Sequence, residues 1–120
     1  MSQWVEVYGS YAFNDGLSLI RFDIHVEQFE GGELHACLYR TRYKVTRETA
    51  ACYVIDVLGT PKYVLKDQTG KRFAYLSDAY AIRSLKKRAY WRVAHAQNAV
   101  LRAEEAYALY KRTFEPDQTL

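Results

Sequence analysis

The chain has 120 residues, a formal net charge of +3 at pH 7 and a hydrophobic fraction of 49%. This length corresponds to one domain, residues 1–120, which is large enough to bury an ordinary core. No apolar run of about 18 residues is present, and the N-terminus lacks the charged start and apolar centre of a signal peptide. We therefore expect a cytoplasmic protein with no membrane segment, whose two cysteines are reduced.

Charge and tyrosine are unevenly distributed along the chain. Residues 1–39 contain six acids and one base, a net charge of −5, whereas residues 40–112 contain sixteen bases and six acids, a net charge of +10. Tyrosine, at 11 of 120 residues, suits binding surfaces because it offers contact area and a hydrogen bond with little entropy to lose. The asymmetry favours an acidic partner for the later part of the chain, or self-association between the two parts.

Alternating polarity predicts two strands near the N-terminus, at residues 4–13 and 17–28. A two-residue Asp15-Gly16 turn between them predicts a hairpin. Its register brings the apolar side chains of both strands to one face, which a slip of one residue would prevent. The expected pairs are Tyr11 with Ile20, Gly9 with Phe22, Val7 with Ile24 and Val5 with Val26.

Gly31-Gly32 predicts a second two-residue turn, into a third strand. The expected pairs across it are Val26 with Cys37, Ile24 with Tyr39, Phe22 with Thr41 and Ile20 with Tyr43. In this register Arg40, Arg42 and Lys44 point to the face opposite the core, and Arg40 lies across from Asp23.

A fourth strand is predicted at residues 51–57, with Ala51, Tyr53, Ile55 and Val57 on its core face. The Leu58-Gly59-Thr60-Pro61 stretch breaks the chain, and residues 62–66 and 71–75 are expected to form a small hairpin. Residues 1–76 are therefore predicted to form an antiparallel meander of four long strands plus this hairpin. With one long helix packed on one face, the fold class is α+β.

The helix is predicted over residues 77–114, and residues 115–120 are a loose tail. The stretch has no Gly or Pro, Ser77 is a suitable N-cap, and Lys111 and Arg112 suit the negative end of the helix dipole. Such a helix is about 57 Å long. A compact domain of this size is only about 35 Å across, so we expect part of the helix to need another partner.

Two stripes run along this helix at heptad-like spacing. One contains the expected dimer seam, which is formed by Val93, Ala96, Val100, Ala103 and Tyr107. The opposite stripe contains Trp91, which is unusual on a solvated face. One interpretation is that the sheet buries one stripe and a second copy the other. A second, compatible interpretation is a partner-recognition patch of Tyr80, Arg83, Lys87, Tyr90 and Trp91.

The basic residues offer an alternative interface, for nucleic acid. The candidates, interleaved with aromatic residues, are Arg40, Arg42, Lys44, Lys71, Arg72, Lys86 and Arg88. Phosphate contacts and base stacking from such a mixture could hold a single strand. The plain alternative is a solvated face whose long side chains cover apolar surface, and the acidic first third opposes a protein devoted to nucleic acid.

No catalytic signature is present. The three histidines form no triad with a serine and an acid, and no glycine-rich phosphate loop occurs. His25, His35, Cys37 and Cys52 are zinc-binding residue types, but the expected register separates His25 from Cys37 and turns Cys52 away from the core face. We expect no metal, no cofactor and no enzymatic activity.

Three short stretches, at residues 53–55, 62–67 and 70–75, are followed by Ala81 and a basic helix. This arrangement resembles small accessory proteins of bacteriophages. The resemblance covers about residues 52–112. It implies a phage-encoded protein that binds and inhibits a host enzyme or a bacterial defence system, including CRISPR effectors. The expectation is therefore a non-catalytic, homodimeric binding protein in the host cytoplasm. The alternatives are nucleic-acid binding and capture of a small nucleotide signal between subunits.

Overall fold

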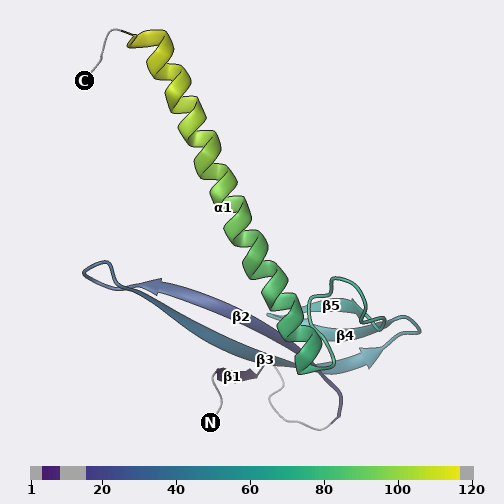
Figure 1. The fold of residues 1–120 in the computed structure, drawn as a ribbon. Coiled ribbons are helices and arrows are strands. Elements are labelled where there is room, and N and C mark those ends of the chain that lie inside the picture. The colour runs from purple at the N-terminus through teal and green to yellow at the C-terminus, as the bar shows by residue number, and fades with distance from the viewer. Residues whose placement is uncertain (1–3, 9–15, 117–120) are drawn as a thin grey trace. The chain divides into compact units, whose positions relative to one another are not determined.

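The computed structural model describes residues 4–8 and 16–116, which form five strands and one long helix (Figure 1). The elements are β1 (Val5–Tyr8), β2 (Ser18–Gln28), β3 (Leu34–Glu48), β4 (Cys52–Val57), β5 (Thr60–Leu65) and α1 (Asp78–Phe114). This arrangement confirms the predicted α+β class. The chain divides into two compact units, Met1–Leu85 and Lys86–Leu120, and each is described by itself.

The first strand pairs differently from the prediction. β1 lies parallel to β3, with Val5 opposite Tyr39 and Tyr8 opposite Arg42, so the sheet is mixed rather than antiparallel throughout. The expected pairs of Val5 with Val26 and of Val7 with Ile24 are therefore wrong. The other two expected pairs, and the residues before Gly16 in the turn, lie outside the described residues. Local alternation predicted the strand but could not identify its neighbour.

The hairpin between β2 and β3 is confirmed, but its register is shifted by one residue. Phe29 and Glu33 close a loop of three residues, in which Gly31 and Gly32 both have positive φ. Ile20 consequently lies opposite Arg42, Phe22 opposite Arg40, and Asp23 opposite Tyr39. Because opposed residues share a face, Arg40 and Arg42 lie on the side of Phe22 and not on the reverse side, as we expected.

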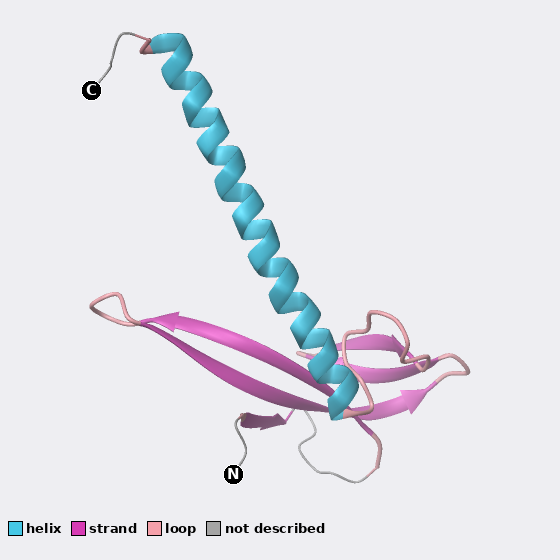
Figure 2. Cartoon of the chain, in the orientation of Figure 1, coloured by secondary structure: helices cyan, strands magenta, loops and turns pink. Residues whose placement is uncertain are grey.

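The later hairpin is formed by β4 and β5, whose turn residues Leu58 and Gly59 have φ angles of 52° and 84°. Two positive φ values match the tight turn that joins twisted strands. Pro61 is tolerated because β5 is an edge strand. The predicted hairpin of 62–66 with 71–75 is wrong: residues 66–77 form a connecting loop (Figure 2), and Tyr75 makes an isolated bridge to Ile20.

Two hydrophobic clusters pack in the first unit. The first cluster contains Leu19, Ile55, Val64 and Ala74, and the second contains Ile20, Phe22, Tyr75 and Ala81. Leu19 and Ile20 are neighbours in β2, and successive strand residues point to opposite faces. The sheet is thus covered on both sides at this point, which the meander prediction did not include.

The residues around these clusters show which of the predicted strand faces are buried. Tyr53, Ile55 and Val57 of β4 lie in or against the first cluster as expected, whereas Ala51 is exposed. Trp4 packs edge-on against Phe22, with 5.1 Å between ring centroids. The side of the first strand that carries Trp4 therefore supplies the apolar contact, whereas Val5, on the other side, is exposed.

The helix begins as predicted. The hydroxyl oxygen of Ser77 accepts a hydrogen bond from the Tyr80 amide at 3.2 Å, which is an N-cap contact. Ala81 and Leu85 in the first two turns pack in the second cluster. The predicted end at Phe114 is also confirmed.

Candidate binding surfaces

Arg40, a candidate for phosphate binding, is held inside the first unit. Its Nε donates to Asp78 Oδ1 at 2.8 Å and its Nη1 donates to Glu6 Oε1 at 2.5 Å. Only 14% of the side chain is exposed. Burial alone would lower the pKa of Arg40, but the hydrogen bonds and negative charges of Asp78 and Glu6 outweigh it and raise the pKa. Arg40 therefore joins β1, β3 and the start of α1.

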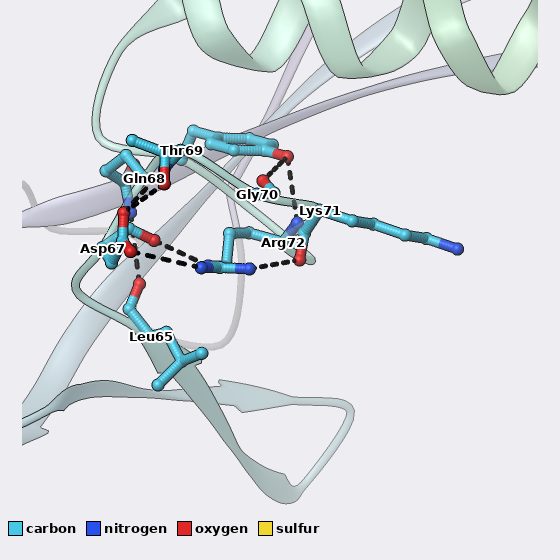
Figure 3. Close-up of polar contacts among 8 residues, drawn as sticks. Leu65, Asp67, Gln68, Thr69, Gly70, Lys71 and Arg72 are labelled. Carbon is cyan, nitrogen blue, oxygen red and sulfur yellow. Dashed lines mark hydrogen bonds and ion pairs between the residues drawn. The ribbon is translucent and has the colours of Figure 1, made fainter.

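Arg72, a second candidate, closes the loop that follows β5. Its Nε donates to the Asp67 carbonyl at 2.6 Å and its Nη1 donates to the Lys71 carbonyl at 2.8 Å (Figure 3). Gly70 leaves room for this guanidinium, since a Cβ there would lie 2.7 Å from Nη1. The Lys71 side chain extends away from the loop (Figure 3). Lys71 is thus accessible, whereas Arg72 is engaged.

The same loop is stabilised by an Asp67–Thr69 turn. Asp67 Oδ1 accepts hydrogen bonds from the Thr69 amide at 3.0 Å and from its hydroxyl at 2.6 Å. These two bonds lower the pKa of Asp67 because they favour its charged form. A turn was predicted at residues 67–70, and these two bonds confirm it, whereas the strand predicted to follow it at residues 71–75 is wrong.

The remaining basic candidates are scattered. Arg42 and Lys44 are half-buried in β3, whereas Lys86 and Arg88 belong to the second unit, where Lys86 is exposed and Arg88 half-buried. Arg40 and Arg72 are engaged in the fold, and the other five candidates are divided among β3, the loop after β5 and α1, so no single element carries them.

The corrected register changes the zinc argument. His25 now lies directly opposite Cys37 on β2 and β3, instead of on the other face. His25 also packs edge-on against Tyr39, with 5.0 Å between ring centroids. Among residues 4–8 and 16–116, however, no three His, Cys, Asp or Glu side chains come close enough together to hold a metal ion.

The outer part of the β2–β3 hairpin is exposed on both faces. β1 pairs with β3 only from Tyr39 onward, so in the described structure residues 34–38 of β3 pair with β2 alone. Val26 and Leu34 expose more than half of their surface on this ribbon. The sequence prediction placed these strands correctly but expected their apolar side chains in the core.

In the second unit, the predicted recognition patch is centred on Tyr90 and Trp91, which are 66% and 57% exposed. Their rings meet edge-on at 5.5 Å, and Trp91 lies against His95 at 5.9 Å between centroids. Lys87 is exposed in the preceding turn. Tyr80 and Arg83, the other predicted members, are exposed residues of the first unit, where Tyr80 stacks on Tyr75 at 6.3 Å.

The predicted seam lies on another side of the same helix. Val93, Ala96, Val100, Ala103 and Tyr107 are all exposed. Tyr107 stacks on Tyr110 at 6.2 Å, and Tyr110 lies 5.7 Å from Phe114, so the stripe ends in a column of aromatic rings. A shallow depression over Ala96 is bordered by Gln97, Val100 and Leu101. The seam is therefore an apolar surface that can accept a neighbour.

Comparison with known protein families, with curated proteins and with solved structures gives no match to this chain. Within the described ranges, no helix combines the length and the apolar content that crossing a bilayer requires.

Proposed function

We propose that this protein is a non-catalytic binding protein and that Trp91, with Tyr90, anchors its target. The observation that carries the proposal is the exposure of a Trp–Tyr pair in the second unit, with 57% of Trp91 accessible. Tryptophan and tyrosine are the residues that most often dominate protein–protein binding energy, because their large rigid surfaces lose little entropy on contact. Lys87 adds a positive charge nearby in the sequence, which favours an acidic target.

The proposed target is a host protein, and the proposed effect is inhibition. Support comes from the resemblance of residues 52–112 to phage accessory proteins, which implies a phage-encoded inhibitor in the host cytoplasm. Bacterial defence systems, including CRISPR effectors, are the target class we propose to test first. We also propose that the protein is a homodimer, joined through the seam of Val93, Ala96, Val100, Ala103 and Tyr107.

Two other functions remain as alternatives. Nucleic-acid binding would now depend on Arg42, Lys44, Lys71, Lys86 and Arg88, since Arg40 and Arg72 hold the fold together. Capture of a small nucleotide between subunits would require the homodimer. Exposed Lys71 and Lys86 support both alternatives, because a single strand and a small nucleotide both carry phosphate and phosphate contacts need accessible charge.

The test compares three forms of the full chain as bait in host lysate: wild type, Trp91→Ala and Leu109→Ala. Leu109 is a matched control, since it is also apolar and 57% exposed on α1. We expect wild type and Leu109→Ala to recover the same host protein. Trp91→Ala should bind that purified protein at least 30-fold more weakly, which corresponds to about 2 kcal/mol. Equal binding by all three forms would overturn the assignment of Trp91.

The nucleic-acid alternative has its own measurement. Fluorescence anisotropy with a single-stranded oligonucleotide at low salt should show no binding if the proposal is right. Binding that weakens steeply with salt, and that Lys71→Glu or Lys86→Glu reduces, would instead assign the protein to nucleic acid.

A further inference from the structure

The seam of α1 changes in side-chain size from one end to the other. Its first part is small, with Ala89, Val93 and Ala96, and its last part is large, with Tyr107, Tyr110 and Phe114. Val100 and Ala103 lie between them. The three aromatic residues remain 60%, 46% and 73% exposed, respectively. A surface with this gradient fits a partner whose gradient runs in the opposite direction.

We propose that the partner is a second copy of this chain and that the two α1 helices pair antiparallel. This inference rests on the homodimer proposed above and adds its direction and register. In an antiparallel pair, each seam residue in the first part of one helix faces a seam residue in the last part of the partner helix. The resulting layers join Ala89 to the partner's Phe114, Val93 to the partner's Tyr110, Ala96 to the partner's Tyr107 and Val100 to the partner's Ala103.

Volume selects this direction. In the antiparallel register the three layers that contain an aromatic residue each combine it with a small side chain, so these layers have similar volumes and interdigitate, and the central layer joins Val100 to Ala103. In a parallel pair Ala89 and Ala96 would meet their own copies and leave voids, whereas Tyr107, Tyr110 and Phe114 would crowd against theirs. Voids and overfilled layers both destabilise packing.

The aromatic end of the seam by itself supplies more than half of the surface that a small specific interface buries. From their exposed fractions, the three aromatic residues alone present about 350 Å² per copy. Two copies therefore contribute about 700 Å² before the valines and alanines are counted, against the roughly 1,200 Å² buried in small specific interfaces. Tyr107 already stacks on Tyr110 in the single chain, and Tyr110 lies against Phe114, so little ordering of these rings remains to be done on association.

The pairing leaves Trp91 free. At about 100° per residue, Trp91 lies about 160° around the helix from Val93, on the side away from the seam. The two Trp91 side chains of the dimer would lie at opposite ends of the helix pair, about 31 Å apart along its axis. A dimer of this form presents two equivalent target sites.

Disulfide trapping in the full chain tests the direction. Cys37 and Cys52 are replaced by Ser, and Val93→Cys and Tyr110→Cys are made in separate, differently tagged chains that are mixed and oxidised. We expect the mixed disulfide to exceed the Val93→Cys homodisulfide at least tenfold, because antiparallel pairing places the two Val93 positions about 25 Å apart. Glu105→Cys, on the outer side of α1, sets the level of random collisions.

Each other outcome overturns a defined statement. A dominant Val93→Cys homodisulfide would show a parallel dimer and overturn the direction alone. Disulfides at the collision level, with a monomeric mass by light scattering, would overturn the direction together with the proposed homodimer. Target binding is measured separately through Trp91→Ala, so failure of the proposed target site is distinguishable from both.

Discussion

Arg40 Nε donates a hydrogen bond to Asp78 Oδ1 at 2.8 Å, which connects the middle of β3 to the first turn of α1. The same guanidinium reaches Glu6 in β1 through Nη1. One side chain therefore joins three elements that are far apart in the sequence. A residue that a charge pattern assigned to phosphate binding is instead part of the fold.

Replacing Arg40 by Met should destabilise the protein. The substitution keeps most of the side-chain volume but leaves the partly buried Glu6 and Asp78 carboxylates without their cation. We expect the free energy of unfolding to fall by about 2–3 kcal/mol, below the cost of breaking a fully buried pair because both acids retain some solvent. Urea unfolding followed by circular dichroism measures it. Arg83→Met, at an exposed position of α1, should change it by less than about 0.5 kcal/mol.

The Asp67–Thr69 turn should make stability depend on acid pH. The hydrogen bonds from Thr69 lower the pKa of Asp67 in the folded state below its unfolded value of about 3.9. Their contribution is therefore present above about pH 5 and is lost as the pH falls through the folded pKa. The urea midpoint of Asp67→Asn should lie below that of wild type at pH 6, and the difference should shrink toward pH 2.5. Thr69→Ala, which removes one of the two bonds, should show part of this effect, and a constant difference would contradict the account.

Gly31→Ala should weaken the β2–β3 hairpin. Gly31 has a φ of +94°, where a Cβ is strained even though nothing lies within 4 Å of it. We expect a loss of about 1 kcal/mol in unfolding free energy. Hydrogen exchange should locate the change in β2 and β3. Glu30→Ala in the same loop is the control, and an equal loss there would mean that the backbone angle is not the cause.

Phe22→Ala should have the largest effect of the single changes. Phe22 is 1% exposed and packs with Ile20, Tyr75, Ala81 and Trp4. Removing the ring leaves a cavity, and the expected cost is about 3–5 kcal/mol. A thermal melt would show it as a large drop in midpoint. Phe29→Ala, at a half-exposed aromatic of the hairpin loop, should cost much less, and similar losses at the two positions would place the core elsewhere.

How much of this structure the sequence predicts depends on how far apart along the chain the interacting residues are. Both ends of α1 were predicted from local signals. These signals are the N-cap residue Ser77, the absence of Gly and Pro along the helix, and the basic residues near Phe114. Gly31-Gly32 predicted a hairpin, but the choice between two and three loop residues could not be made from the glycines alone. That single residue moved Arg40 to the face of Phe22 and set His25 opposite Cys37.

The candidate surfaces show the same difference between features set by local sequence and features set by contacts in the folded chain. The periodicity of α1 placed Trp91 and the Val93–Tyr107 seam on separate sides of the helix, because helix geometry is local. Arg72 lies in a basic pair in the sequence, yet its partners are backbone carbonyls of its own loop. The roles of Trp91 and of the seam in binding stay predictions that the experiments above address.

The sequence by itself determined the class of the fold, the extent of α1 and the chemical character of its sides, since these follow from short-range propensity and periodicity. Only the tertiary structure decided that β1 lies beside β3, that the hairpin register is shifted, and that Arg40 and Arg72 are engaged. Those outcomes depend on contacts between distant segments, which compete on small differences in free energy that no local pattern records.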